Sequence, residues 1–172
     1  VALEDCHFED SEADEGGALS VVGGAEVAAT NCSFVRNRAR RGGAVLVDGG
    51  AADFAECRFE DNSADDEGGA LLVRGTIGAG VVLRQRTVLL RNSVPSIRVM
   101  AGGHAEYRLP APKGRWIDAP GGEVQLLTGG VTADFPYACA PGVSGSADST
   151  EGGWTAQNGP QCTELCPSGF MC

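Results

Sequence analysis

The stretch that decides the fold is Cys32-Ser33-Phe34, followed eight residues later by Gly42-Gly43-Ala44-Val45-Leu46-Val47. This pair of phrases recurs about every 26 residues, and a fixed period in this range indicates stacked coils rather than one globular core. The other copies are Cys6-His7-Phe8 with Gly16-Gly17-Ala18-Leu19, and Cys57-Arg58-Phe59 with Gly68-Gly69-Ala70-Leu71.

Each repeat has the alternation of short β-strands. Cys32 and Phe34 are two residues apart, as are Val45 and Val47, so in extended chain each pair points to one side. A third extended stretch, such as residues 26–29, closes each turn. Three strands per turn with Gly-rich corners predict an all-β chain wound into a parallel β-helix of about three to four coils. A leucine-rich repeat is the main rival, but its Leu-x-x-Leu-x-Leu frame is missing.

Stacking the coils places like residues over one another at the spacing of neighbouring strands, roughly 4.8 Å. We expect an inward ladder in which each Cys is a small buried hydrophobe and each Phe fills the core. The Gly-Gly pair suits a corner that needs positive φ or close approach of the next coil. The inward ladder comprises Cys6, Phe8, Cys32, Phe34, Cys57 and Phe59.

Two polar columns follow the same register. Ser11, Asn37, Asn62 and Asn92 form a predicted asparagine column with a structural role, since stacked asparagines bond one another and nearby backbone. Charge alternates from coil to coil in the neighbouring columns, so opposite signs lie over each other. We expect these pairs to disfavour slips in register rather than to add much stability, about 0.2–1 kcal/mol each. The columns read Asp10, Arg36, Asp61 and Arg91, and Glu15, Arg41 and Glu67.

The pattern fades after residue 92, where several prolines occur that cannot donate to a strand ladder. We therefore predict parallel β-helix repeats over residues 1–94 and a capping or irregular β segment over 95–133. Residues 97–99, 106–109 and 123–127 are candidate edge strands in that segment. A cysteine-rich module is expected over 134–172.

The tail holds four cysteines among Gly and Pro, with almost no apolar pattern. Such a segment cannot form a core without cross-links. Zinc is the alternative, because Cys-x3-Cys is near ligand spacing. Disulfides are favoured, because the phrase Cys166-Pro167-Ser168-Gly169-Phe170 is typical of disulfide modules. The four cysteines are Cys139, Cys162, Cys166 and Cys172.

Two resemblances follow from these motifs. The repeats, with Phe34-x-x-Asn37 and Gly42-Gly43-Ala44-Val45, resemble those of polymorphic outer membrane proteins and related pectin-lyase-like β-helix proteins, which implies a right-handed helix. The tail, with Cys139-x-Pro-Gly142 and the cysteines from 162 to 172, resembles the ephrin-receptor-type cysteine-rich repeat. The linking phrase Leu109–Trp116 is similar to those that join such modules in large surface proteins of algae and other protists. These motifs imply architecture rather than an activity.

With that module in mind, we predict that Cys139 pairs with Cys162, and that Cys166 pairs with Cys172 or with a residue beyond it. Closing a loop of this size stabilises a fold by about 3 kcal/mol in the chain-entropy model. Non-reducing peptide mapping decides the pairing.

The composition limits the classes of function that the chain is expected to have. The 172 residues carry a formal charge of −10, which argues against binding nucleic acid, because phosphate contacts need clustered Lys and Arg. No apolar run approaches the roughly 20 residues that span a bilayer, so membrane insertion is not expected. The sequence begins without Met or a leader pattern, and we expect it to be a piece of a larger protein.

The candidate chemical groups favour structure over catalysis. His7 lies between inward residues and should face solvent, and His104 has no partners for a catalytic triad. Asp65 and Asp66 suit acid–base work or, with neighbouring acids, calcium, but Arg40 and Arg41 in the same column favour a salt-bridged face. We therefore expect no catalytic residue, no metal and no cofactor.

The combined pattern predicts a module of a larger extracellular or cell-surface protein. We expect a structural or adhesive role through protein–protein association, with other copies or with other coat or filament proteins as partners and glycans as further candidates. The alternative is a carbohydrate-binding or polysaccharide-processing β-helix. That alternative calls for a groove with exposed aromatic side chains and converging carboxylates.

Overall fold

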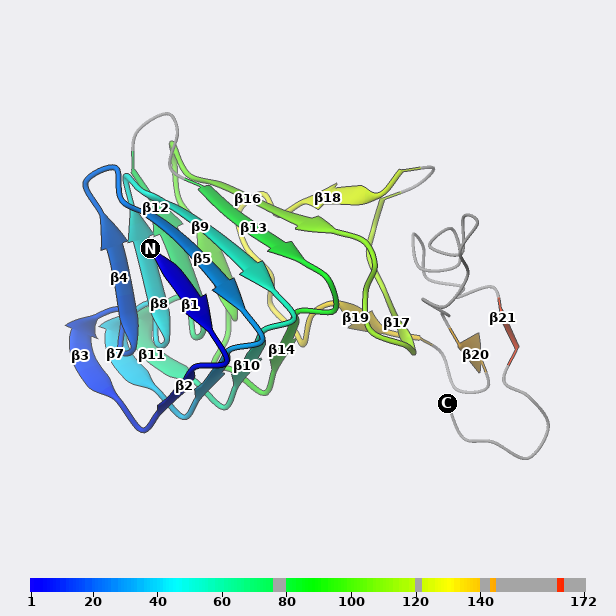
Figure 1. The fold of residues 1–172 in the computed structure, drawn as a ribbon, viewed down its shortest axis with the longest axis horizontal. Helices are drawn as coiled ribbons and strands as arrows, with labels where there is room; N and C mark the ends of the chain where they lie inside the picture. The colour runs from blue at the N-terminus through cyan, green and yellow to red at the C-terminus, as the bar shows by residue number, and fades with distance from the viewer. Residues whose placement is uncertain (76–79, 120–121, 140–142, 145–163, 166–172) are drawn as a thin grey trace.

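The chain winds into a β-solenoid of about four coils (Figure 1). The structure, a computed structural model, describes residues 1–75, 80–119 and 122–139, and the backbone of 143–144 and 164–165. Within these residues every regular element is a β-strand. The predicted all-β, stacked parallel fold is confirmed.

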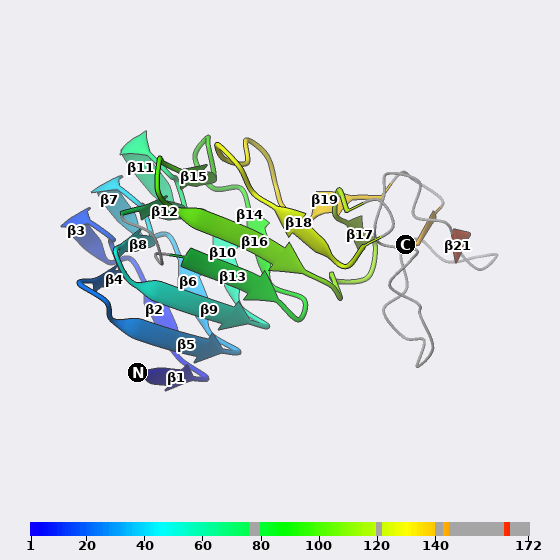
Figure 2. The ribbon, with the colours of Figure 1, turned by 90° about the horizontal axis from the view of Figure 1, so that it is seen from above.

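Each complete coil has four strands, and equivalent strands of successive coils pair in parallel to form four sheets (Figure 2). Sheet A contains β1 (Ala2–Glu4), β5 (Glu26–Thr30), β9 (Ala51–Ala55), β13 (Gly80–Arg84) and β16 (His104–Arg108). Sheet B contains β2 (His7–Glu9), β6 (Ser33–Val35), β10 (Arg58–Glu60) and β14 (Val88–Leu90). Sheet C contains β3 (Glu12–Glu15), β7 (Arg38–Arg41) and β11 (Ser63–Glu67). Sheet D contains β4 (Leu19–Val22), β8 (Val45–Asp48), β12 (Leu71–Arg74) and β15 (Ile97–Val99).

We number the coils by these strands. Coil 1 is β1–β4, coil 2 is β5–β8, coil 3 is β9–β12 and coil 4 is β13–β15. The expectation of three strands per turn was wrong, because it missed sheet C. The strands of sheet C are almost entirely charged, and their inward position is only an alanine, such as Ala39, which is fully buried.

The structure contains the inward ladder of Cys and Phe, with its members in coils 2 and 3 buried and Cys6 and Phe8 half-buried. The Phe8 and Phe34 rings stack with centroids 4.9 Å apart, and Phe34 and Phe59 stack at 4.7 Å. Leu89 continues the column in β14, as its register with Phe59 requires. Offset stacking adds about 0.5–1.5 kcal/mol per aromatic pair beyond burial of apolar area, so this column is a principal source of core energy.

The Gly-Gly corners are also confirmed, and the two glycines serve different purposes. Gly42 has φ 62°, in the left-handed region. At Gly43 an added Cβ would lie 2.1 Å from the carbonyl oxygen of Gly69, so the stacked coil leaves no room for a side chain. The first glycine therefore sets the bend, and the second allows the coils to approach.

The expected boundary at residue 94 was wrong, because parallel pairing continues through β15 and β16 to Arg108. Pro95 does not disturb a ladder, since it lies at the corner and its carbonyl accepts the N–H of Gly69 at 2.8 Å. The three predicted strands are present as β15, β16 and β18 (Val124–Leu126), but β16 lies between β13 and β18 and not at an edge.

A cap covers the C-terminal end of the solenoid. β18 adds to sheet A antiparallel to β16, and bridges join Val131 to Ile97 and Phe135 to Leu89. The buried Ser96 hydroxyl lies 3.0 Å from the carbonyl oxygen of Val131 and 2.9 Å from that of Ala133, and fixes the cap to coil 4.

The expected cysteine-rich module does not begin at residue 134, because Phe135 is buried in the core against the Tyr107 ring. β17 (Arg115–Trp116) then pairs antiparallel with β19 (Tyr137–Ala138), and β20 (Val143–Ser144) with β21 (Glu164–Leu165). Cys162, Cys166 and Cys172 lie outside the described residues, so the predicted disulfides stay predictions.

Candidate functional site

The asparagine column forms a continuous hydrogen-bonded ladder inside the turn that follows sheet B. The Asn37 Nδ2 donates to Asn62 Oδ1 at 3.0 Å, and the Asn62 Nδ2 donates to Asn92 Oδ1 at 2.9 Å. The backbone N–H of Asn37 also donates to Asn62 Oδ1, at 2.9 Å. Asn37 and Asn62 are fully buried. The predicted structural role is confirmed, and these amides are engaged in holding the coils together.

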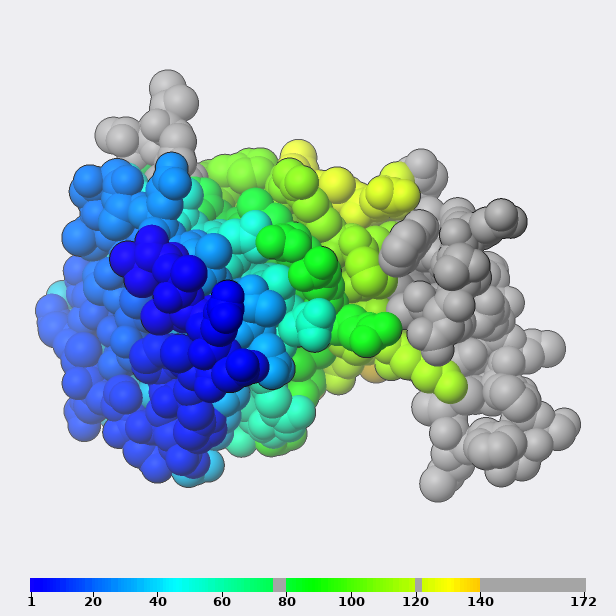
Figure 3. Space-filling model, viewed as in Figure 1, coloured from blue at the N-terminus to red at the C-terminus, as the bar shows by residue number. Residues whose placement is uncertain are grey.

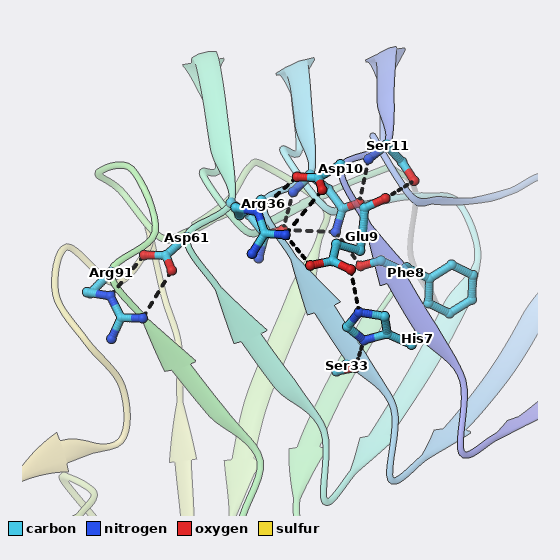
Figure 4. A network of polar contacts seen from close by, with 11 residues as sticks. His7, Phe8, Glu9, Asp10, Ser11, Ser33, Arg36, Asp61 and Arg91 are labelled. Atoms are coloured by element: carbon cyan, nitrogen blue, oxygen red, sulfur yellow. Dashed lines mark hydrogen bonds and ion pairs between the residues drawn. The ribbon is translucent and has the colours of Figure 1, made fainter.

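The residue before Ser11 and before each asparagine of the column lies in the left-handed region and carries an exposed charged side chain. Figure 4 shows this column, in which Arg36 Nε donates to Asp10 Oδ1 and Arg91 Nε to Asp61 Oδ1, both at 2.9 Å. Arg36 also contacts Glu9. The φ values are 51° at Asp10, 51° at Arg36, 54° at Asp61 and 50° at Arg91.

The second charge column lies in sheet C, and it also places opposite charges over one another. Arg41 lies in register with Glu15 on one side and Glu67 on the other. Its guanidinium is 3.4 Å from Glu15, and its Nε is 3.5 Å from Asp66. The Glu15 carboxylate also forms an ion pair with Arg74 of coil 3, whose Nη2 lies 2.9 Å from Glu15 Oε2. The predicted alternation is thus present as inter-coil ion pairs, although Glu67 pairs with Arg98 of coil 4.

These ion pairs lower the pKa values of four carboxyls in coil 1. Hydrogen bonds from His7 and then Arg36 lower the pKa of Glu9, and Arg36 lowers that of Asp10. The hydrogen bond from Arg40 lowers the pKa of Asp14, and that from Arg74 lowers the pKa of Glu15. A carboxyl that acts as a general acid needs a raised pKa instead.

The groups that sequence reasoning weighed for catalysis each contact a neighbouring side chain of opposite charge or polar character. His7 faces solvent, as expected, and its ring contacts Ser33 and Glu9. Asp65 accepts from Arg38 at 2.8 Å, and Asp66 lies 3.4 Å from Arg40. Within the described residues, no group of three His, Cys, Asp or Glu side chains is arranged to hold a metal ion.

A groove of about 420 Å³ crosses the outer face of sheet A. Its floor includes Ala28, Ala51 and Gly80, and sequence reasoning missed it because small outward residues carry no signal. Asp53 at its side is neutralised by Arg84, whose Nε lies 2.8 Å away. The ionisable side chains of its described lining are Glu26, Asp53 and His104, and none of the described lining residues is Phe, Tyr or Trp.

His104 stands at one end of a short polar cluster on β16. Its Nε2 lies 3.2 Å from Glu106, which also accepts from Arg108 Nε at 2.6 Å. Burial raises the pKa of Glu106, but the hydrogen bonds from Arg108 and His104 together lower it below its ordinary value. The carboxylate is therefore ionised and satisfied rather than poised to donate a proton.

The three cysteines of the inward ladder are free thiols. Burial raises the pKa of Cys57 to about 12 and also raises that of Cys32. A thiol protonated in this way is a poor nucleophile. Cys6 is only half-buried, because coil 1 has no coil before it in the structure.

The N-terminal end of the solenoid, defined as the outer edges of β1, β2, β3 and β4, is open in the described structure. Each of these strands is the last in its sheet, and Figure 3 shows coil 1, in blue, forming the surface at this end. Inward positions that are completely buried in coil 2 are only half-buried in coil 1. They are Leu3, Cys6, Phe8, Ala18 and Leu19.

A scan against protein-family models and searches of the curated proteins and of the solved structures returned no match. None of the described residues forms a helix long and apolar enough to cross a membrane.

Proposed function

We propose that this chain is a structural or adhesive module that acts by protein–protein association. The observation that carries the proposal is the charged surface of the coils, where ion pairs repeat from coil to coil instead of gathering at one site. The strand edges of coil 1 are also exposed in the described structure, and such edges are templates for pairing unless they are covered.

We place the module outside the cell, within a larger surface or filament protein. Support comes from the sequence alone: the repeats resemble pectin-lyase-like β-helices, and the cysteine-rich tail resembles the ephrin-receptor type. Disulfides are stable in such an oxidising setting. Copies of the same protein or other coat or filament proteins are the proposed partners.

A non-catalytic role is part of the proposal. Polar side chains repeat with the coil, whereas an active site gathers unlike groups with separated pKa values. The carboxyls of Glu9, Asp10 and Glu15 accept from arginine or histidine, and their pKa values are lowered. Such groups are structural anions.

The groove on sheet A is what favours the alternative, a carbohydrate-binding β-helix. Its size fits a short saccharide or an extended peptide. Against this reading, its described lining has no aromatic ring on which a sugar can stack, and Arg84 holds its Asp53 carboxylate.

The test combines association and turnover. The purified chain should self-associate or bind neighbouring coat proteins, and Glu4→Pro should weaken this, because alternation along β1 points the Glu4 N–H out of the edge. Glu4→Ala is the matched control that removes the charge and keeps the N–H. The chain should be inert on acidic polysaccharides. Turnover that Asp65→Asn and Asp66→Asn abolish would place it among the enzymes.

A further inference from the structure

One face of the solenoid carries charge that alternates coil by coil. This charged face consists of the turns between sheets B and C and the strands of sheet C, and within each coil it carries charges of a single sign. Figure 1 shows sheet C on the side of the solenoid away from β17 and β19. The ionisable residues of the face are Asp10, Glu12, Asp14 and Glu15 in coil 1, Arg36, Arg38, Arg40 and Arg41 in coil 2, Asp61, Asp65, Asp66 and Glu67 in coil 3, and Arg91 in coil 4.

The side chains in the middle of this face are exposed and have hydrogen-bonding capacity left over. The Arg38 and Asp65 side chains are 59% and 56% exposed, and Arg38 donates to Asp65 through Nη2 at 2.8 Å. A guanidinium has five N–H donors, and a carboxylate accepts about four hydrogen bonds. The ion pairs between coils therefore leave donors and acceptors on both residues for a further partner.

An alternating face is complementary to itself in a particular arrangement. If two copies face each other with their coils at the same level, acidic coils lie against acidic coils, and like charges across an interface are strongly unfavourable. If a two-fold axis passes between coils 2 and 3, coil 2 of each copy faces coil 3 of the other, and coil 1 faces coil 4. Every coil then meets a coil of opposite sign. The axis also reverses strand direction, which changes no sign because each coil carries one sign across the face.

The net charge of −10 does not oppose this contact at moderate salt. At about 0.15 M salt the Debye length is roughly 8 Å, so charges elsewhere on the two chains are screened from one another. Charges that touch across the face are screened much less. The pattern on the face, rather than the net charge, therefore decides whether two copies attract.

We propose that the charged face binds a second copy of this chain in antiparallel orientation, related by a two-fold axis between coils 2 and 3. Near the middle of the face, Arg38 of each copy lies opposite Asp65 of the other. The face spans four coils at roughly 4.8 Å each, so the contact is small and weak and forms at high local concentration. A two-fold pair is closed and leaves no face for a third copy. This inference rests on the proposed associative function and names its partner.

Sedimentation velocity over a concentration series of the full chain measures the association. We expect dimers at about 0.15 M salt, and an association constant at least about tenfold lower at about 1 M, where the Debye length falls to roughly 3 Å. Species that grow beyond a dimer with concentration would indicate parallel copies shifted by one coil, and would overturn the two-fold arrangement.

Two charge-reversed variants locate the contact. Arg38→Glu and Asp65→Arg each place like charges at both central contacts of their own dimer, and each should weaken self-association at least about tenfold. In an equimolar mixture of the two variants, the mixed dimer has opposite charges at both contacts, so association should return to about the wild-type strength. Mixing cannot repair a folding defect within one chain, so this recovery identifies a contact between chains.

Matched controls lie on sheet A. Arg84→Glu and Asp53→Arg make the same changes in charge and also break an inter-coil ion pair of 2.8 Å. They should leave self-association unchanged, alone or mixed. Equal effects of the control and test variants, or a mixture of the test variants that associates no better than either alone, would reduce the interaction to general charge attraction and overturn the inference.

The failure of this inference is distinguishable from that of the proposed function. Self-association that Glu4→Pro abolishes and Arg38→Glu leaves unchanged would run through the edge of β1, which overturns the charged-face dimer and supports the proposed function. A chain that stays monomeric at about 0.15 M salt also overturns the dimer. Binding to neighbouring coat proteins then remains the separate measurement of the proposed function.

Discussion

At the residue scale, the structure differs most from expectation at non-glycine residues with positive φ. Sequence reasoning assigned the bends to glycine, which is correct at Gly16, Gly42 and Gly68. Each coil also bends where the chain carries a charged residue or asparagine, as at Asn31 and Glu56. Nothing in those residue types distinguishes them from ordinary surface positions. The left-handed conformation costs a residue with a Cβ roughly 1 kcal/mol or more relative to glycine.

Glu56→Gly is therefore expected to stabilise the fold. Glu56 is exposed with φ 55°, and its N–H donates to the Gln85 carbonyl at 3.0 Å, a bond that glycine keeps. We expect a gain of about 0.5–1 kcal/mol in the free energy of unfolding, measured by denaturant titration. Glu4→Gly, in a strand without positive φ, should destabilise by a similar amount. A loss at position 56 would contradict the strain argument.

The inward cysteines should differ in reactivity along the ladder. Burial keeps the Cys57 thiol protonated, with a pKa of about 12, so at about pH 8 only a minute fraction is thiolate. Cys6 lies half-buried at the open end. Iodoacetamide added to the native chain should modify Cys6 well before Cys57, as peptide mass spectrometry would show. Equal rates in the native chain, rather than only after unfolding, would mean that the ladder is not closed.

At the element scale, strands that repeat an apolar pattern were predictable and strands that do not were missed. Sheets A, B and D carry recurring Val, Phe or Leu at inward positions. Sheet C carries alternating charges over an inward alanine, which a turn carries equally well. The fourth coil was cut short because Pro95 and Ser96 replace Gly and Ala, and only the stacked backbone shows that the coil continues.

The asparagine ladder is the element whose loss should cost most per side chain. Asn62→Ala removes the acceptor for the Asn37 N–H and the donor to the Phe34 carbonyl, which accepts at 2.9 Å. Leaving these buried groups unpaired should cost about 2–4 kcal/mol in the free energy of unfolding. Ser11→Ala, at the open end of the same column, should cost under about 0.5 kcal/mol. Similar losses at both positions would show that burial, not pairing, sets the cost.

At the scale of the whole molecule, the alternation of charge by coil gives the solenoid polarity. Coil 1 is acidic, whereas coil 4 is basic in its described residues and carries the cap. The groove on sheet A could not be predicted from the sequence, because it is defined by what stacking leaves uncovered and no motif records it.

The same charge pattern predicts how stability depends on pH. The folded-state pKa values of Glu9, Asp10, Asp14 and Glu15 lie below their ordinary values of 4.5 for Glu and 3.8 for Asp. An unfolded chain therefore binds protons before the folded one does as the solution is acidified, and folding becomes less favourable. We expect the melting temperature to hold from about pH 7 to pH 5 and to fall toward about pH 3.

Two variants and a change in salt concentration test whether inter-coil ion pairs cause that fall. Glu15→Gln removes a carboxylate that accepts from Arg74 and Arg41, so its melting temperature should be lower at neutral pH and converge on the wild-type value in acid. Glu12→Gln, which removes a carboxylate without an ion pair in the described structure, should follow the wild-type curve. High salt should weaken the exposed pairs and flatten the dependence. If the Glu15→Gln and wild-type curves run parallel from neutral pH to acid, the ion pairs do not stabilise the stack, and the coil-to-coil charge alternation acts on register and partner choice alone.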